Sequence, residues 1–224
     1  MINRRLFFKH VRAALFSGKM SPAQVEGIGF ILDSWEAMMA AGGSAGLAAG
    51  SAAGPAAGDD RWLAYVLATA FHETAFTMQP IREFGGPGYY FRMYDPASPL
   101  PDRAALARRM RARPGDGVVF YGRGYVQLTW RTNYEKMGSV FGVDLTSSAK
   151  AADAALDAAL AAKIMLRGMI EGSFTGRKLS GYFNDARADW RGARRIINGL
   201  DRAQEIAAYG RKFHAAIGQV RVSA

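Results

Sequence analysis

Two glutamates stand ten positions apart in the segment ATAFHETAFTMQPIREFG, and their neighbours differ in character. Glu73 lies in an apolar run near the end of an expected helix, whereas Glu83 follows Arg82 in a loop-like segment. Hydrolysis of a glycosidic bond needs one protonated acid and one ionised carboxylate. Apolar surroundings favour the protonated form, and a nearby cation favours the ionised form. The pair is therefore a candidate acid and base, although two unrelated surface acids would show the same spacing.

The dipeptide His72-Glu73 also raises the question of a zinc protease. The H-E-x-x-H motif needs a second histidine where this chain has Phe76, and the other histidines are His10 and His214. The chain has no cysteine, which excludes disulfides and thiolate metal sites. We therefore expect no metal and no cofactor. His72 is expected to be a core or supporting residue that hydrogen-bonds locally.

A second dense segment, FYGRGYVQLTWRTNYEKMG, spans residues 120–138. Gly122 and Gly124 flank Arg123 and allow the backbone to approach a neighbour or a ligand closely. The segment lacks the G-K-[ST] ending of a phosphate-binding loop. These glycines therefore point to close packing or to a ligand other than a nucleotide.

Polar residues interrupt the apolar part of this segment. If a helix begins near Thr129, Asn133 lies one turn later on the same face. Such side chains, with Gln127, can order a water or bind sugar hydroxyls, and the rings of Tyr121 and Trp130 suit a pyranose. A capping threonine and ordinary packing aromatics would explain the same residues.

Asn198 precedes Gly199 at an expected turn between two helices, in ARRIINGLDRAQEIAAYGRKF. On local grounds a left-handed helix end explains this asparagine more simply than a functional role does.

Helical periodicity extends over most of the chain, and half of the residues are hydrophobic, with alanine prominent. Ser21 and Gln24 around Pro22 form a capping box that predicts a helix start. Residues 77–102 predict a long ordered loop, and residues 118–128 a short hairpin or extended segment. The predicted helices cover residues 1–20, 22–39, 60–73, 102–113, 129–141, 153–171, 188–197 and 202–217.

These elements predict one mainly α catalytic domain over residues 1–224. It comprises N-terminal helices at 1–39, a flexible Ala/Gly insert at 40–58 and a catalytic core at 59–224. Neither a signal peptide nor a membrane span is predicted. We therefore expect synthesis in a cytoplasm, with another protein providing an exit route if the target lies outside.

The formal net charge of +10 favours a polyanionic partner such as nucleic acid, anionic lipid or bacterial wall. The basic run RAALARRMRARP lacks interleaved aromatics and any known DNA-reading motif, so no nucleic-acid partner is expected. This run is expected to be a solvated basic face, or a face that helps to dock the protein on an anionic wall.

Together these segments resemble family 19 of the glycoside hydrolases, especially its bacteriophage and prophage endolysin branch. His72-Glu73-Thr74 resembles the family's H-E-T, YGRGYVQLTWRTNY its G-R-G-x-x-Q-L-[ST]-x-x-x-N-Y signature, and RRIINGL its R-R-x-I-N-G segment. The N-terminal segment FFKHVRAALFSGKMSPAQVEGIGFILDSWE is similar to helices of phage wall hydrolases.

The resemblance implies a lysozyme-like two-lobed helical fold with a loop-rich substrate cleft and at most a small β-hairpin. It implies an inverting mechanism in which Glu73 is the general acid, Glu83 the general base, and Thr129 positions the attacking water. The expected substrate-binding residues are His72, Tyr121, Gln127, Trp130, Asn133, Asn198 and Arg211. Plant enzymes of the family space the two acids more widely, so the short spacing resembles the phage enzymes.

We therefore predict a monomeric peptidoglycan hydrolase that cleaves β-1,4 bonds of glycan strands and docks on the anionic wall or outer membrane. Cleavage on the muramidase or the glucosaminidase side stays open. The alternatives are a chitinase acting on chitin oligomers and a non-catalytic basic wall-binding protein.

Overall fold

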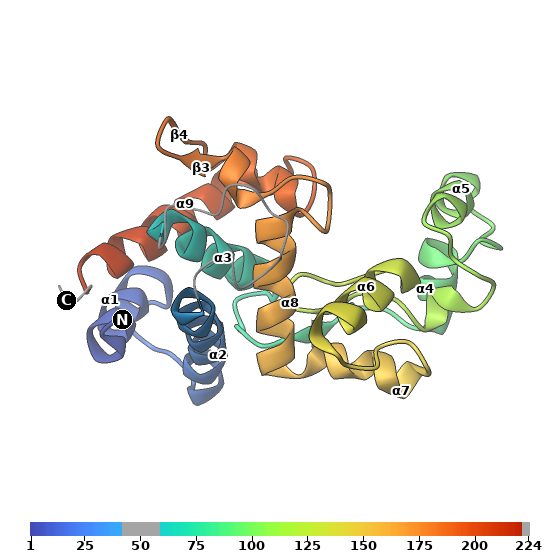
Figure 1. Cartoon of the computed structure of the whole chain (residues 1–224), viewed down its shortest axis with the longest axis horizontal. Coiled ribbons are helices and arrows are strands. Elements are labelled where there is room, and N and C mark those ends of the chain that lie inside the picture. The colour runs from blue at the N-terminus through green and yellow to red at the C-terminus, as the bar shows by residue number, and fades with distance from the viewer. Residues whose placement is uncertain (42–58, 221–224) are drawn as a thin grey trace. The chain divides into compact units, whose positions relative to one another are not determined.

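The computed structural model describes residues 1–41 and 59–220 (Figure 1), so most of the predicted Ala/Gly insert lies outside the described residues. The chain forms two compact units. The first unit comprises Met1–Gln79 and Met165–Ala224, and the second comprises Pro80–Ile164. Within the described ranges no helix is both long and apolar enough to cross a membrane.

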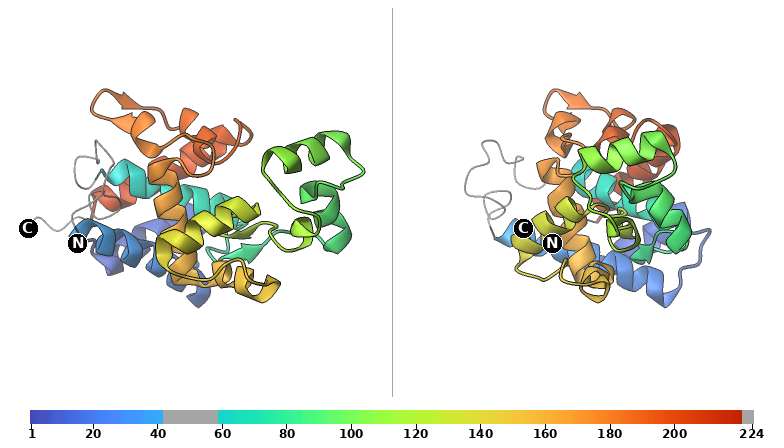
Figure 2. Two further views of the ribbon diagram at one scale, coloured as in Figure 1. Left: turned by 45° about the vertical axis from the view of Figure 1, so that its right-hand side comes forward. Right: turned by 90° about the vertical axis from the view of Figure 1, so that its right-hand side faces the viewer.

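Helices make up most of the first unit, and α3 lies at its centre. This helix packs along α9, which also contacts α1 (Figures 1 and 2). Ten consecutive residues of α3, from Trp62 to Phe71, are buried, because neighbouring segments cover all of its sides. The helices of this unit are α1 (Arg4–Leu15), α2 (Pro22–Ala40), α3 (Asp60–Glu73), the later part of α8 (Ala158–Glu171) and α9 (Ala203–Gly218).

Side-chain caps begin the first three helices. Asn3, Ser21 and Asp59 each accept a hydrogen bond from a backbone N–H of the following turn. At Ser21 the reciprocal bond from the N-cap N–H to Gln24 is also present, which confirms the predicted capping box. The structure likewise confirms the predicted N-terminal, second, third and last helices, with ends that differ by a few residues.

The predicted helix over residues 188–197 is wrong. Strand β3 (Phe183–Asn184) pairs with β4 (Arg187–Ala188) as a hairpin, and only η5 (Gly192–Ile196) is helical, as a 3₁₀ turn. A carboxylate explains the break, because Asp189 accepts a hydrogen bond from the Gly192 N–H at 2.7 Å. A short turn, η4 (Leu179–Gly181), precedes the hairpin.

The second unit joins short helices to one small strand pair. Its antiparallel pair places Ile81 opposite Gly124 and Arg82 opposite Arg123, which confirms the extended segment predicted within 118–128. The elements are β1 (Ile81–Arg82), α4 (Pro87–Tyr94), α5 (Pro101–Arg109), η2 (Asp116–Val118), β2 (Arg123–Gly124), α6 (Arg131–Phe141), α7 (Ala149–Ala152), η3 (Asp153–Leu156) and the first part of α8.

The predicted loop over residues 77–102 is wrong in part, because α4 lies inside it and α5 begins at its end. Each of these helices starts with a proline, Pro87 or Pro101, whose fixed φ suits the first helical position. Helix α4 packs against α5 and η2 and buries Tyr90. Eight residues give too little periodicity to be recognised between glycines and prolines.

Two further helix starts differ from the prediction. Trp130 has a φ of 72°, so α6 begins at Arg131 and Thr129 lies before the helix. Residues 153–156 form a 3₁₀ turn, and Asp157 then caps α8 by accepting a hydrogen bond from Leu160 N–H. The mainly α, lysozyme-like fold is confirmed, but residues 1–41 and 59–220 contain two small antiparallel strand pairs, where at most one small hairpin was expected.

Candidate active site

Glu73 is the last residue of α3, and its neighbour Thr74 fixes how the helix ends. The Thr74 hydroxyl donates to the Ala70 carbonyl at 2.8 Å and accepts from the Met78 N–H at 3.0 Å. Thr74 is fully buried. The H-E-T segment therefore combines an acid with a threonine that turns the chain directly after it.

The turn after Glu73 has strained backbone. Ala75, Phe76 and Met78 all have positive φ values, which side chains other than glycine adopt at a cost of about 1–2 kcal/mol each. Strain of this kind persists only where surrounding contacts impose it, and it is common next to functional sites.

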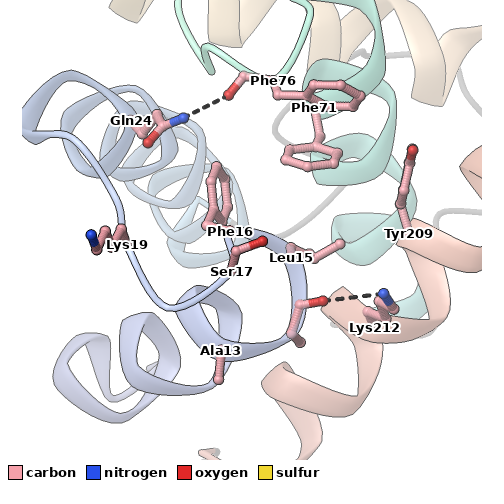
Figure 3. Close-up of a pocket in the computed structure, with 11 residues that line it drawn as sticks. Ala13, Leu15, Phe16, Ser17, Lys19, Gln24, Phe71, Phe76, Tyr209 and Lys212 are labelled. Carbon is pink, nitrogen blue, oxygen red and sulfur yellow. Dashed lines mark hydrogen bonds between the residues drawn. The ribbon is translucent and has the colours of Figure 1, made fainter.

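Helix α2 supplies contacts that impose the strained turn. Gln24 donates to the Phe76 carbonyl at 3.0 Å (Figure 3), and Gln79 donates to the Ala23 carbonyl at 2.5 Å. A Cβ atom at Gly27 would overlap the Met78 carbonyl oxygen. Glycine therefore lets α2 approach the turn closely enough to hold it.

Aromatic rings pack beside the same turn in the pocket of Figure 3, which has a volume of about 490 Å³. The ring of Phe71 lies 5.1 Å from Phe16, 4.6 Å from Phe76 and 4.9 Å from Tyr209. The apolar residues around Glu73 therefore pack against one another and leave its carboxylate to a different partner.

That partner is Arg194, from η5, whose guanidinium forms an ion pair with the Glu73 carboxylate. The Arg194 side chain is only 4% exposed, and its Nε also donates to the Asp201 carbonyl at 3.1 Å. Glu73 is therefore partly removed from water, as expected, but the direct partner of its carboxylate is a cation and not an apolar group. A general acid must donate a proton to the leaving oxygen, so this contact must change if Glu73 has that role.

His72 is half-buried beside Glu73. Burial lowers the pKa of His72 below its ordinary value, while the charge of Glu73 opposes this shift. Within residues 1–41 and 59–220 its imidazole forms no hydrogen bond, so the expected local bond is not found. The neutral imidazole is therefore free to contact a ligand.

Asn198 and Arg211 both belong to the first unit. Asn198 is exposed in the loop after η5, and its side-chain oxygen accepts from Gly199 N–H at 2.9 Å. Asn198 does not adopt a left-handed conformation, contrary to the sequence-based alternative; Arg202 does, with a φ of 56°. Arg211 is exposed on α9 and donates to the Ala207 carbonyl of its own helix at 3.3 Å.

Glu83 follows β1 in the second unit and accepts three hydrogen bonds. Tyr94 donates to Oε1 at 2.7 Å and Tyr89 donates to Oε1 at 3.3 Å. The N–H of Gly122 donates to Oε2 at 3.0 Å. These contacts supply a hydrogen-bond donor to each oxygen of the carboxylate and fix its orientation.

The tyrosines remain protonated donors. Burial raises the pKa of Tyr94 well above its ordinary value, and its hydrogen bond to Glu83 adds to the shift. Burial and the charge of Glu83 raise the pKa of Tyr89 in the same direction. Glycine at 122 keeps this approach close, because an added Cβ would lie 2.6 Å from the side-chain oxygen of Gln127 and 3.2 Å from Cβ of Glu83, so those side chains would have to shift.

Arg82 does not pair with Glu83, so the predicted source of its ionisation is wrong. Arg82 instead donates to Asp153 at 2.8 Å and to the Tyr121 hydroxyl at 3.1 Å. The ring of Tyr121 stacks on Tyr90 at 3.9 Å, and the guanidinium of Arg123 lies 3.9 Å above the same ring. Its faces are thus engaged by protein groups, and only the ring edge can meet a substrate.

The segment after β2 holds the other predicted residues. Gln127 donates to the Ile81 and Gly124 carbonyls at 3.3 Å. Trp130 is 9% exposed and packs edge-on against Tyr94 at 5.1 Å. These contacts tie the segment to the strand pair and to a tyrosine that binds Glu83.

Thr129 and Asn133 are connected, although not through one helix face. The Asn133 side chain donates to the Thr129 carbonyl at 2.9 Å. The Thr129 hydroxyl has no hydrogen-bond partner in the described part of the chain. It is therefore available to bind a water or a sugar hydroxyl, as the predicted role requires.

Each unit thus contributes one carboxylate with its own set of partners. The sequence-based reasoning missed Arg194, Tyr89, Tyr94 and the N–H of Gly122. Arg194 belongs to the RRIINGL segment, so the resemblance contained a signal for it. The tyrosines stand in a segment without recognisable motif. No cluster of three or more potential metal ligands occurs within the described ranges.

The sequence pattern of the family described as chitinase class I matches residues 22–169. This range is more than half of the chain and includes Glu73, Glu83, Thr129 and Asn133. No curated protein matches the chain.

Solved structures of chitinases have the same fold. Chitinase C from Streptomyces griseus is 19% identical, with a TM-score of 0.54, over 100% of this chain and 79% of that one. A chitinase C mutant is 21% identical, with a TM-score of 0.53, over 97% and 92%. A bacterial family 19 chitinase is 20% identical, with a TM-score of 0.56, over 100% and 97%. The chain therefore belongs to the chitinase class I family, glycoside hydrolase family 19, and is a glycoside hydrolase.

Proposed function

We propose that this glycoside hydrolase cleaves β-1,4 bonds in the glycan strands of peptidoglycan, as an endolysin-like enzyme. The observation that carries the mechanism is the difference between its two carboxylates. Glu83 accepts hydrogen bonds from Tyr89, Tyr94 and Gly122, whereas Glu73 has a single buried cationic partner in Arg194.

The partners of Glu83 suit a general base. A general base must be ionised before it takes a proton from water. Neutral hydrogen-bond donors stabilise the ionised carboxylate without forming an ion pair with it. Thr129, with a free hydroxyl in the same unit, is proposed to position the water. The configuration at the anomeric carbon is inverted, because this water attacks from the face opposite the leaving group.

Glu73 is proposed to protonate the leaving oxygen. The pairing with Arg194 means that Glu73 must exchange this contact for a proton during the catalytic cycle. We propose that Glu73 takes this proton from solvent and then transfers it to the leaving oxygen, while Arg194 keeps its second bond to the Asp201 carbonyl.

The net charge of +10 supports peptidoglycan as substrate. Wall strands carry peptide carboxylates and lie among phosphate polymers, so a basic enzyme is attracted to them. We propose that the protein works there as a monomer, after a holin or another export route gives it access.

Chitin oligomers are the second candidate substrate. They are favoured by the family description and by the chitinases whose structures resemble this one. Measuring new reducing ends from purified peptidoglycan and from chitin oligomers separates the two. We expect faster release from peptidoglycan; release from chitin oligomers alone would contradict the proposed substrate.

A further inference from the structure

A pocket of about 510 Å³ in the first unit is lined by four basic residues and no acidic one. Three short segments provide them: the loop after α8, the β3–β4 hairpin and η5, which Figures 1 and 2 show in orange to red. The basic residues are Arg177, Lys178, Arg187 and Arg195, and two glycines and Tyr182 complete the lining.

One carboxylate, Asp189, lies near this positive charge, and it is not part of the lining. Asp189 pairs with Arg187 and also interacts electrostatically with Arg195. Arg177, Lys178 and Arg195 form no side-chain hydrogen bond or ion pair in the described part of the chain, and all three are exposed. Cations held around one hollow repel one another, so an anion bound among them is stabilised.

The pocket is held in shape by contacts that do not use these charges. The Thr175 hydroxyl donates to the Arg195 and Ile196 carbonyls at 2.7 and 3.0 Å, which ties the loop to η5. Tyr182 is buried, and the guanidinium of Arg187 lies 5.5 Å above its ring. A preformed site loses less conformational entropy when it binds a ligand.

We propose that this basic pocket binds a phosphate or phosphodiester group. One guanidinium group can donate two parallel hydrogen bonds to two oxygens of a phosphate, and an ammonium group adds a point charge. A singly charged carboxylate would leave most of these donors unused. Because the proposal concerns binding alone, it stands whether or not the enzyme cleaves peptidoglycan.

The test is a titration of the full chain with inorganic phosphate, followed by backbone amide NMR at constant ionic strength. The amides of residues 176–181 are expected to shift and saturate. In the triple variant Arg177→Gln, Lys178→Gln, Arg195→Gln, we expect phosphate binding at least ~10-fold weaker, because charge-assisted bonds are lost. Arg187 is left unchanged because it already has a partner.

A charge-matched control removes three exposed cations from α1 that line another pocket, of about 600 Å³, through Arg5→Gln, Lys9→Gln and Arg12→Gln, so it also tests whether any basic pocket binds phosphate. This control is expected to bind phosphate as the wild type does. Equal binding by the pocket variant and the wild type would overturn the proposal. So would shifts spread over the whole surface, which show an adventitious ion only. Unchanged thermal midpoints and unchanged circular dichroism spectra show that each variant is folded.

Two further arms identify the source of the phosphate. A poly(glycerol phosphate) chain represents wall polymers, and phosphatidylglycerol vesicles represent lipid headgroups. The proposal is supported if one of these two ligands binds the wild type and the α1 control but not the pocket variant. The ligand that does so identifies the source of the phosphate. If neither arm depends on the pocket, the proposal fails.

Discussion

The carboxylate of Glu73 and the guanidinium of Arg194 depend on each other because both are largely removed from water. The side chains are 18% and 4% exposed. Removing one partner of such a pair leaves a poorly solvated charge, which is a strongly destabilising change.

We therefore expect Arg194→Ala to lower the free energy of unfolding by about 3–5 kcal/mol and to reduce glycan cleavage. Arg194→Lys keeps the charge but not the second bond to Asp201, and should lie between the alanine variant and the wild type. Denaturant unfolding and reducing-end release measure the two effects. A wild-type free energy of unfolding in Arg194→Ala would show that the ion pair does not stabilise the fold.

For Glu83 the expected effect is on the chemical step. Glu83→Ala should lower turnover by about 10²–10⁴, the usual contribution of general acid–base catalysis. Glu135→Ala, an exposed acid on α6, is the matched control and should cleave normally. Near-wild-type turnover in Glu83→Ala would assign the base elsewhere. Asp95 is a poor substitute, because it is fully buried and bonded to the N–H groups of Ala97 and Gly115.

His72 gives a prediction about pH. Burial lowers its pKa in the folded protein, so below the ordinary value of about 6.5 the unfolded chain binds more protons. Stability should therefore fall as the pH is lowered through this range. In His72→Gln the loss of unfolding free energy between about pH 7 and pH 5 should be smaller. His10→Gln controls for removal of an imidazole, and identical pH profiles for His72→Gln and wild type would refute the assignment.

At the scale of elements, the N-terminal part of α2 determines the shape of the turn after Glu73. Three of the four residues 75–78 have left-handed backbone conformations, which are unfavourable without outside contacts. The contacts of Gln24, Gln79 and Gly27 keep the turn from changing to a less strained conformation. We therefore expect α2 to affect activity only indirectly, through the position of Glu73.

Two glycines of α2 form a matched pair for this claim. Gly27→Ala should destabilise the protein by about 1–3 kcal/mol and reduce cleavage, because the new Cβ overlaps the Met78 carbonyl. Gly29→Ala meets no atom within 4 Å and should stabilise the helix by about 0.5–1 kcal/mol. Thermal unfolding and cleavage assays measure both. Equal effects of the two substitutions would disprove the close contact.

The same elements show what a sequence can reveal. The capping box at Ser21 was predictable because all of its atoms lie within four residues. Helix α4 was not predictable, because it has only eight residues and begins at Pro87, directly after two glycines. The partners of Glu73 and Glu83 were mispredicted for a different reason. Arg194 is 121 positions from Glu73 and Gly122 is 39 from Glu83, so neighbours in sequence were poor guides to neighbours in space.

At the scale of the whole molecule, family membership accounts for the type of reaction, and the net charge is the feature behind the proposed wall substrate. The family accounts for hydrolysis of a glycosidic bond, and we propose that the charge of +10 attracts the enzyme to a polyanionic substrate. Salt screens such charges beyond about 10 Å at 0.1 M. The proposed preference for peptidoglycan over neutral chitin oligomers should therefore be clearest in assays at low ionic strength.

The most direct measurement is mass spectrometry of purified peptidoglycan treated with the wild-type enzyme and with Glu73→Gln. The wild type should produce fragments with new hydrated reducing ends, and those ends identify which sugar bond is cut. Glu73→Gln should produce none while it keeps the wild-type circular dichroism spectrum. Normal digestion by Glu73→Gln, or no digestion of peptidoglycan by an active wild type, would contradict the proposed function.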